Sequence, residues 1–167
     1  MVTLDKENCI ILTLMQEDCR MSLTDIAKKV GLSIDAVKKR LNRMMQEGIF
    51  YPKIQLRPRH FGFSTIVEVR IELHNCSKKD LDGFISYVTD NPAVVEVFSF
   101  SGSWDIGLVL LARDAQDLGR ITADIRGRFR KIIRRWIESL TTGVYKFERY
   151  DILALMGYKK PGEGKSG

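Results

Sequence analysis

The sequence has few of the residues that build disulfide frameworks and metal centres. It holds 3 cysteines and 2 histidines among 167 residues, and no two cysteines form a CxxC pair. We therefore expect no disulfide framework, no metal site and a reducing cytoplasm as the location. The longest apolar runs are far shorter than the roughly 20 residues that cross a bilayer, so no membrane partner is expected. No apolar stretch follows a basic start, so we expect no secretory signal.

The net charge of +6 is unevenly spread: residues 126–135 contain no acidic residue, and residues 60–125 contain few basic ones. Residues 1–59 hold 11 Lys and Arg against 7 Asp and Glu, and residues 60–125 hold 5 against 10. A basic N-terminal part joined to an acidic middle indicates two modules, and the basic one suits a polyanion.

Amphipathic segments in the first 50 residues predict three helices. Asp5, Ser22 and Ser33 each stand where an N-cap is needed, and Gly31 supplies a sharp turn between the second and third segments. Two helices joined by a short turn that contains glycine are typical of a helix-turn-helix.

The third of these segments, residues 33–48, has one apolar and one basic side. Its apolar arc comprises Ile34, Val37, Leu41, Met44 and Met45. A helix anchored in this way and presenting Lys, Arg and Asn outward suits the major groove of DNA, although most amphipathic helices are only solvated surface helices. The candidate DNA-contacting residues are Ser22, Ser33, Asp35, Ala36, Lys39, Arg40, Asn42, Arg43 and Lys53.

Two short alternating stretches, residues 49–51 and 53–56, predict a small β-hairpin around Pro52. Such a hairpin would complete a winged helix-turn-helix over residues 1–56. Pro and Gly residues bracket the following segment, residues 57–62, which we interpret as a hinge.

The pattern beyond the hinge predicts a second module over residues 63–153. Alternating or apolar strands are expected at 67–73, 93–101, 106–112 and 137–153, with one helix at 81–88 and a long one after Asp114. The order β-α-β-β-α-β is that of a ferredoxin-like domain, so the expected fold class is α+β. The second and third strands are apolar on both faces, which favours a sheet face covered by a second copy of the chain. Residues 157–167 are Gly- and Lys-rich, and we expect a disordered tail there.

Six basic residues crowd into the ten positions 126–135, within the expected second helix and its end. They are Arg126, Arg128, Arg130, Lys131, Arg134 and Arg135. Three interpretations stay open: a solvated helix end, a partner for the acidic region of a neighbouring chain, or a second track for DNA.

Several motifs together resemble one family. They are Leu4-Asp5-x-x-Asn8-x-x-Ile11-Leu12, the run Ser22 to Ser33, Val37-x-x-Arg40-Leu41-x-x-Met44, Glu47-Gly48-Ile49 and the GxxD turn Gly102 to Asp105. The sequence resembles the Lrp/AsnC, or feast/famine, regulators over about residues 3–152. Asn8 stands where an acidic residue is more usual, a change at a cap position that we expect to be neutral.

This resemblance implies a transcriptional regulator that binds double-stranded DNA. Chains would pair through their sheets into homodimers, and dimers would assemble into tetramers or octamers. An amino acid or a related metabolite would bind between subunits, with no other cofactor. The effector residues would be Gly102, Ser103, Trp104, Asp105, Thr141 and Thr142. From the residues alone, Gly102 to Asp105 is equally well a plain hairpin turn.

Two other classes of function remain to be weighed. Some relatives of this family are decarboxylases in haem synthesis, but these need a catalytic His and Tyr in the second module. Here the only histidine beyond the hinge is His74, and no catalytic triad or phosphate loop is present, so we expect no enzyme. A sensing and assembly module without DNA binding is the other alternative, and Lys39, Arg40 and Arg43 argue against it.

Overall fold

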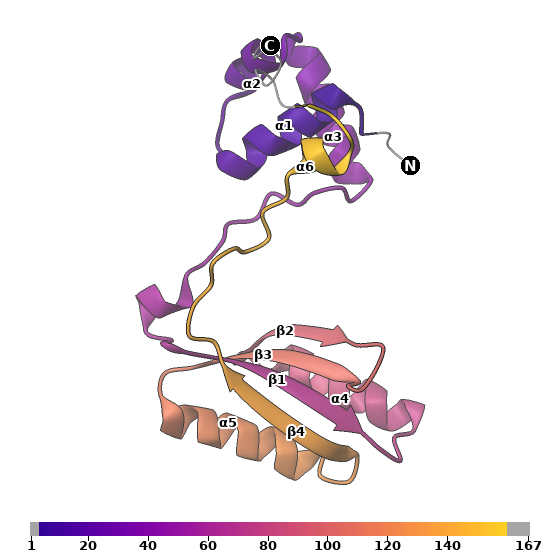
Figure 1. Cartoon of the computed structure of the whole chain (residues 1–167), viewed down its shortest axis with the longest axis vertical. Coiled ribbons are helices and arrows are strands. Elements are labelled where there is room, and N and C mark those ends of the chain that lie inside the picture. The colour runs from indigo at the N-terminus through magenta and orange to yellow at the C-terminus, as the bar shows by residue number, and fades with distance from the viewer. Residues whose placement is uncertain (1–3, 160–167) are drawn as a thin grey trace, which may run out of the picture. The chain divides into compact units, whose positions relative to one another are not determined.

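The computed structural model describes residues 4–159, which divide into two compact units (Figure 1). The first unit joins the chain up to Ile54 with the segment from Lys146 onward, and the second spans Gln55–Tyr145. The first is helical, whereas the second is a four-stranded sheet with two α-helices and a short 3-10 helix, η1 Pro58–Phe61. The predicted α+β class is therefore confirmed.

The first unit begins with three helices whose N-terminal caps lie at the predicted residues. Their bounds are α1 Lys6–Glu17, α2 Leu23–Val30 and α3 Ile34–Gln46. Each cap side chain accepts a hydrogen bond from the amide three residues further on, which satisfies one exposed donor at each helix start; the caps are Asp5, Ser22 and Ser33. Gly31 ends α2 with a φ of 77°, in the left-handed region that glycine adopts without strain.

The apolar sides of these helices form the first core. In α3 the buried side chains are Val37, Leu41 and Met44, which follow helical spacing. Ile34 and Met45, expected on the same arc, are 46% and 37% exposed and lie near the two ends of the helix. The predicted arc was therefore wider than the surface that is covered.

The two strands expected at 49–51 and 53–56 are not formed. Residues 49–57 carry no strand in the described part of the chain, and Lys53 N donates to Tyr51 O at 2.9 Å in a local turn. Tyr51, Ile54 and Leu56 are between 64% and 78% exposed. An isolated hairpin is marginally stable in water, and within this stretch only Phe50 packs against the first core.

The C-terminal segment also differs from the prediction, because it returns to the first unit. The last strand is β4 (Ile133–Leu140), not 137–153, and it is followed later by a short helix, α6 (Ile152–Leu155). α6 packs against α1, and Leu153 is 3% exposed. Gln16 fastens the segment, since its amide group donates to Tyr150 O and accepts from Tyr150 N, both at 3.0 Å.

The predicted tail, 157–167, is ordered at its start. Tyr158 N donates to Leu153 O at 2.8 Å, and Tyr158 Oη donates to Leu4 O at 3.4 Å. The rest of that prediction, residues 160–167, lies outside the described residues.

The second unit has the predicted βαββαβ order. Its elements are β1 Thr65–Leu73, α4 Lys78–Asp90, β2 Val94–Ser99, β3 Ile106–Ala112, α5 Ala115–Arg128 and β4. The strands lie in the order β2-β3-β1-β4, with all neighbours antiparallel, and α4 and α5 cover one face (Figure 1). The core lies between sheet and helices, where Val67, Val69, Ile71 and Phe84 are at most 1% exposed.

The opposite face of the sheet is mixed in character. Residues directly opposite each other in antiparallel strands share a face, so one row across this face reads Phe98, Gly107, Arg70, Ile137. Phe98 and Ile137 are 38% and 42% exposed. The Phe98 ring lies over Gly107, since a Cβ on Gly107 would come within 2.2 Å of it. The described part of this chain leaves this face uncovered.

The basic cluster at 126–135 does not lie on one helix, as the sequence pattern suggested. α5 ends at Arg128, the chain turns, and β4 begins at Ile133. Phe129 packs edge-on against Phe84 at 5.0 Å between ring centroids, and Ile132 is buried. The spacing of Phe129 and Ile132 fits a continued helix, but both residues lie in the turn between α5 and β4 and pack into the core from there.

Candidate functional site

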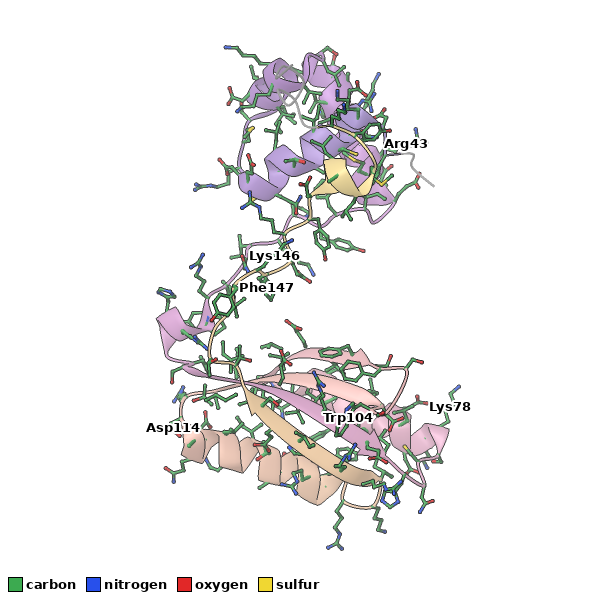
Figure 2. All side chains as sticks on the ribbon, in the orientation of Figure 1. Arg43, Lys78, Trp104, Asp114, Lys146 and Phe147 are labelled. Atoms are coloured by element: carbon green, nitrogen blue, oxygen red, sulfur yellow. The ribbon has the colours of Figure 1, made fainter. Side chains whose placement is uncertain are left out.

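The first candidate site is the outward side of α3. Asp35, Lys39, Asn42 and Arg43 are exposed and follow i, i+3 and i+4 spacing, so they form one stripe (Figure 2 labels Arg43). The buried side chains on the other side of the helix hold this stripe outward. Ala36, in the first turn, is half-buried.

The charges on this stripe are mostly available. Arg43 Nε is 3.9 Å from Glu47 Oε1, a distant surface pair of small energetic value. Lys39 has no ion pair within the described residues. Available Lys and Arg side chains on an exposed helix face can contact phosphates and base edges.

Arg40 has a different environment from its neighbours. Its Nη1 donates to Asp5 Oδ2 at 2.6 Å and to Asn8 Oδ1 at 2.9 Å. Asn8 is 4% exposed, so it is a buried partner of Arg40 and not a cap-position residue; the cap of α1 is Asp5. Arg40 therefore joins α3 to the start of α1 and holds the outward stripe in place.

The same contact changes the acidity of Asp5. Burial alone would raise the pKa of Asp5, but the hydrogen bonds from Arg40 and from the Asn8 amide, with the positive charge of Arg40, lower it. The carboxylate is thus held ionised, where it can retain Arg40.

The remaining predicted DNA contacts lie at helix starts and after α3. Ser22 and Ser33 are exposed caps, so the first-turn amides of α2 and α3 lie beside them. Lys53 is exposed, with its Nζ 5.4 Å from the centroid of the Tyr51 ring. Ile34 was expected in the core, but it is exposed at the start of α3. This position makes Ile34 a candidate for contact with a thymine methyl group.

The second candidate site is the turn from Gly102 to Asp105 between β2 and β3. Gly102 has a φ of 140°, which favours glycine. Asp105 N donates to Ile71 O at 2.9 Å, and Asp105 Oδ2 accepts from Leu73 N at 2.7 Å. Ser103 is exposed. Asp105 therefore secures the turn to β1, as the plain-turn interpretation requires, while its carboxylate keeps further acceptor capacity.

Two residues beside this turn were not singled out by the sequence pattern. The Arg135 guanidinium lies 4.1 Å from the centroid of the Trp104 ring, a cation–π contact (Figure 2 labels Trp104). Glu72 pairs with both Arg134 and Arg135, at 3.2 and 3.3 Å. The sequence shows Arg135 only as one member of a basic cluster. Its contact with Trp104 could not be predicted, because that contact depends on the order of the strands in the sheet.

Thr141 and Thr142 lie apart from this turn. They follow β4, and Thr141 N donates to Ile66 O at 2.8 Å, whereas Asp105 pairs at Ile71. Five residues of strand separate Ile66 from Ile71, about 17 Å. The carbonyl oxygens of both threonines also accept from Arg59. Within one subunit, the six predicted effector residues are therefore not brought together.

No group of three or more His, Cys, Asp and Glu side chains among residues 4–159 could hold a metal ion. In the same described range, no helix combines the length and the apolar character needed to span a membrane.

Known proteins share both units with this chain. The winged helix-turn-helix DNA-binding family matches residues 10–50, and the Lrp/AsnC ligand binding domain matches residues 64–132. The DNA-binding transcriptional activator DecR of Escherichia coli K12 is 32% identical over 103 residues, which is 61% of this chain and 68% of DecR.

Two solved structures extend the likeness over most of the chain. An AsnC family transcriptional regulator from Agrobacterium tumefaciens is 28% identical with a TM-score of 0.76, covering 86% of this chain and 93% of the other. A transcriptional regulator from Neisseria meningitidis in complex with L-Met is 22% identical with a TM-score of 0.78, covering 87% and 94%, and shows the same fold. The two domain matches and the likeness to DecR show that the chain belongs to the Lrp/AsnC family of DNA-binding transcriptional regulators.

Proposed function

We propose that the protein binds specific duplex DNA through the exposed stripe of α3. Lys39, Asn42 and Arg43 contact base edges and phosphates, and Asp35 and Ala36 lie at the end of the helix that enters the groove. Ser22 and Ser33 place helix N-termini against phosphates, with Lys53 as a further phosphate contact. Arg40 acts by positioning α3. The observation that carries this proposal is a basic stripe fixed outward by Val37, Leu41 and Met44.

The test is fluorescence anisotropy with labelled duplex from the region upstream of the protein's own gene. We expect Lys39→Ala and Arg43→Ala each to weaken binding by about tenfold, and to reduce the salt dependence of the affinity by about one charge. Lys78→Ala removes an equal charge from an exposed position of α4 (Figure 2) and should bind normally. Unchanged binding by both α3 variants would refute this DNA interface.

We also propose that an amino acid or related metabolite binds at the turn Gly102 to Asp105. The domain match over 64–132 and the L-Met complex of the Neisseria regulator support a small-molecule effector. Backbone amides beside Gly102 can hold a carboxylate, Asp105 can accept from an ammonium group, and Trp104 can wall the site. Thr141 and Thr142 would have to come from another subunit, because they lie at the far end of the sheet.

A thermal-shift screen of the amino acids tests this effector site. We expect at least one to raise the unfolding temperature of the wild type. Asp105→Asn keeps an oxygen for the Leu73 amide but removes the negative charge, so the turn should persist while stabilisation by an amino acid is lost. Equal stabilisation of both proteins would show that Asp105 is only a turn residue.

We also propose how the chains assemble, which unit carries which role, and where the protein acts. The exposed row containing Phe98 and Ile137 supports pairing through the sheets into a homodimer, from which tetramers or octamers can form. The helical unit, including the segment from Lys146 onward, binds DNA, while the second unit senses the effector and assembles. We infer a cytoplasmic regulator without enzymatic activity, supported by its free cysteines and by its regulator relatives.

A further inference from the structure

A cleft of about 320 Å³ lies between α5 and the edge strand β4, in the second unit. Its lining includes Arg126 and Gly127 from α5, Arg130 from the following turn, and Ile133, Arg134 and Trp136 from β4. None of the residues Gly102 to Asp105 lines it. The cleft therefore shares no lining residue with the proposed effector turn.

Three of the residues that line this cleft are arginines, Arg126, Arg130 and Arg134, and no acidic residue lines it. Within the described residues, neither Arg126 nor Arg130 has a carboxylate within 4 Å. Arg134 shares a single carboxylate, that of Glu72, with Arg135. Like charges on one small lining repel one another, so an anion bound there is attracted chiefly by Arg126 and Arg130, because Arg134 already pairs with Glu72.

The chemistry of the lining favours a particular kind of anion. Guanidinium forks bind phosphate and carboxylate groups through two parallel hydrogen bonds. Ile133 and Trp136 are half-buried and add an apolar wall, and the volume is at the lower end of the range for small-molecule sites. A track for DNA would spread its charges along a surface to follow successive phosphates, whereas these three arginines line one small cleft.

We propose that this cleft binds a small organic anion, a phosphate ester or polycarboxylate whose apolar part packs against Ile133 and Trp136. The site goes beyond the DNA and amino-acid sites proposed above, and its binding can be measured without either. Anion binding would give the arginine-rich end of α5 a function, whereas a merely solvated helix end would have none.

Gly127 offers a way to block the cleft without disturbing the fold. A Cβ added there meets nothing within 4 Å, and Gly127 is not among the residues with positive φ. A leucine at this position can therefore be accepted by the helix while its side chain extends into the cleft. Gly127→Leu tests whether binding needs the volume of the cleft, and Arg126→Gln and Arg130→Gln test whether it needs the positive charge of the lining.

The experiment measures binding of phenyl phosphate and inorganic phosphate to the full chain at constant ionic strength by calorimetry. Trp136 fluorescence in a Trp104→Phe background gives a second readout, because Trp136 is then the only tryptophan. We expect saturable binding, tighter for phenyl phosphate because of the apolar wall. Arg126→Gln, Arg130→Gln and Gly127→Leu should each weaken it by about tenfold or more.

Lys131→Gln is the matched control, since it removes one charge from the same basic cluster but does not line the cleft. It should bind phenyl phosphate as the wild type does. Equal weakening by Lys131→Gln, or no saturable binding at all, would overturn the proposal. It would also be overturned if Arg126→Gln and Arg130→Gln left phenyl phosphate binding intact but weakened DNA binding, which would assign the cluster to DNA. Circular dichroism confirms that each variant is folded.

Discussion

The two units of this protein bury their apolar residues in different ways. The helical unit covers its core with its own chain, including α6, which arrives from the far end of the sequence. The sheet unit covers one face with α4 and α5 and leaves a partly apolar row exposed on the other. The helical unit is thus completed within the chain, whereas the sheet unit keeps an open face that the proposed dimer would cover.

The largest expected effect comes from removing the C-terminal contribution to the helical unit. Leu153→Ala should destabilise this unit by about 2–4 kcal/mol, because a buried leucine is replaced by a cavity. Urea unfolding followed by circular dichroism measures the change. Leu155→Ala, in the same short helix but 71% exposed, should shift stability by less than about 0.5 kcal/mol. Equal effects from both would mean that α6 is not part of the core.

A smaller effect is expected on the open face of the sheet. In Gly107→Ala, the added Cβ occupies the space of the Phe98 ring, which must move. We expect a cost of about 1–3 kcal/mol from overpacking, and weaker association of the proposed dimer because the exposed row is rearranged. Sedimentation velocity measures the second effect. Gly119→Ala, whose Cβ meets nothing within 4 Å, is the control and should leave association unchanged.

The smallest effect concerns the Asp5–Arg40 contact. The pKa of Asp5 is lowered on folding, so its contribution to stability is present above the unfolded pKa of about 3.9 and is lost as the pH falls through the lower folded value. Asp5→Asn keeps a capping side chain, and it should lower stability by less than about 1 kcal/mol because Asp5 is partly exposed. Thermal unfolding should show this difference near neutral pH, and the difference should shrink as the pH is lowered below about 4. A difference independent of pH would assign it to packing.

Local signals predicted much of the helical unit and the order of the sheet unit. Asp5, Ser22 and Ser33 cap helices in the structure, because a cap depends on residues within three positions of one another. The alternation from Val67 onward correctly predicted β1, since a strand with one buried face repeats every second residue.

The structure departs from the sequence pattern where distant segments decide the outcome. The alternation at 49–56 did not become a wing, and the pattern at 137–153 became a strand only as far as Leu140, after which the chain returns to the helical unit. Arg40 was grouped with the DNA-contacting residues, but Asp5 and Asn8, more than 30 positions away, hold it. Thr141 and Thr142 were grouped with Gly102, from which strand direction separates them.

By itself, the sequence determined the three capped helices, the βαββαβ order and the basic side of α3, because short-range spacing encodes each of them. Only the tertiary structure decided which basic residues remain available and which are held, because ion pairs form across elements. It alone brought Arg135 to Trp104 and gathered three arginines around one cleft. Charge along the chain is visible in sequence, but its convergence in space depends on how α5 turns into β4.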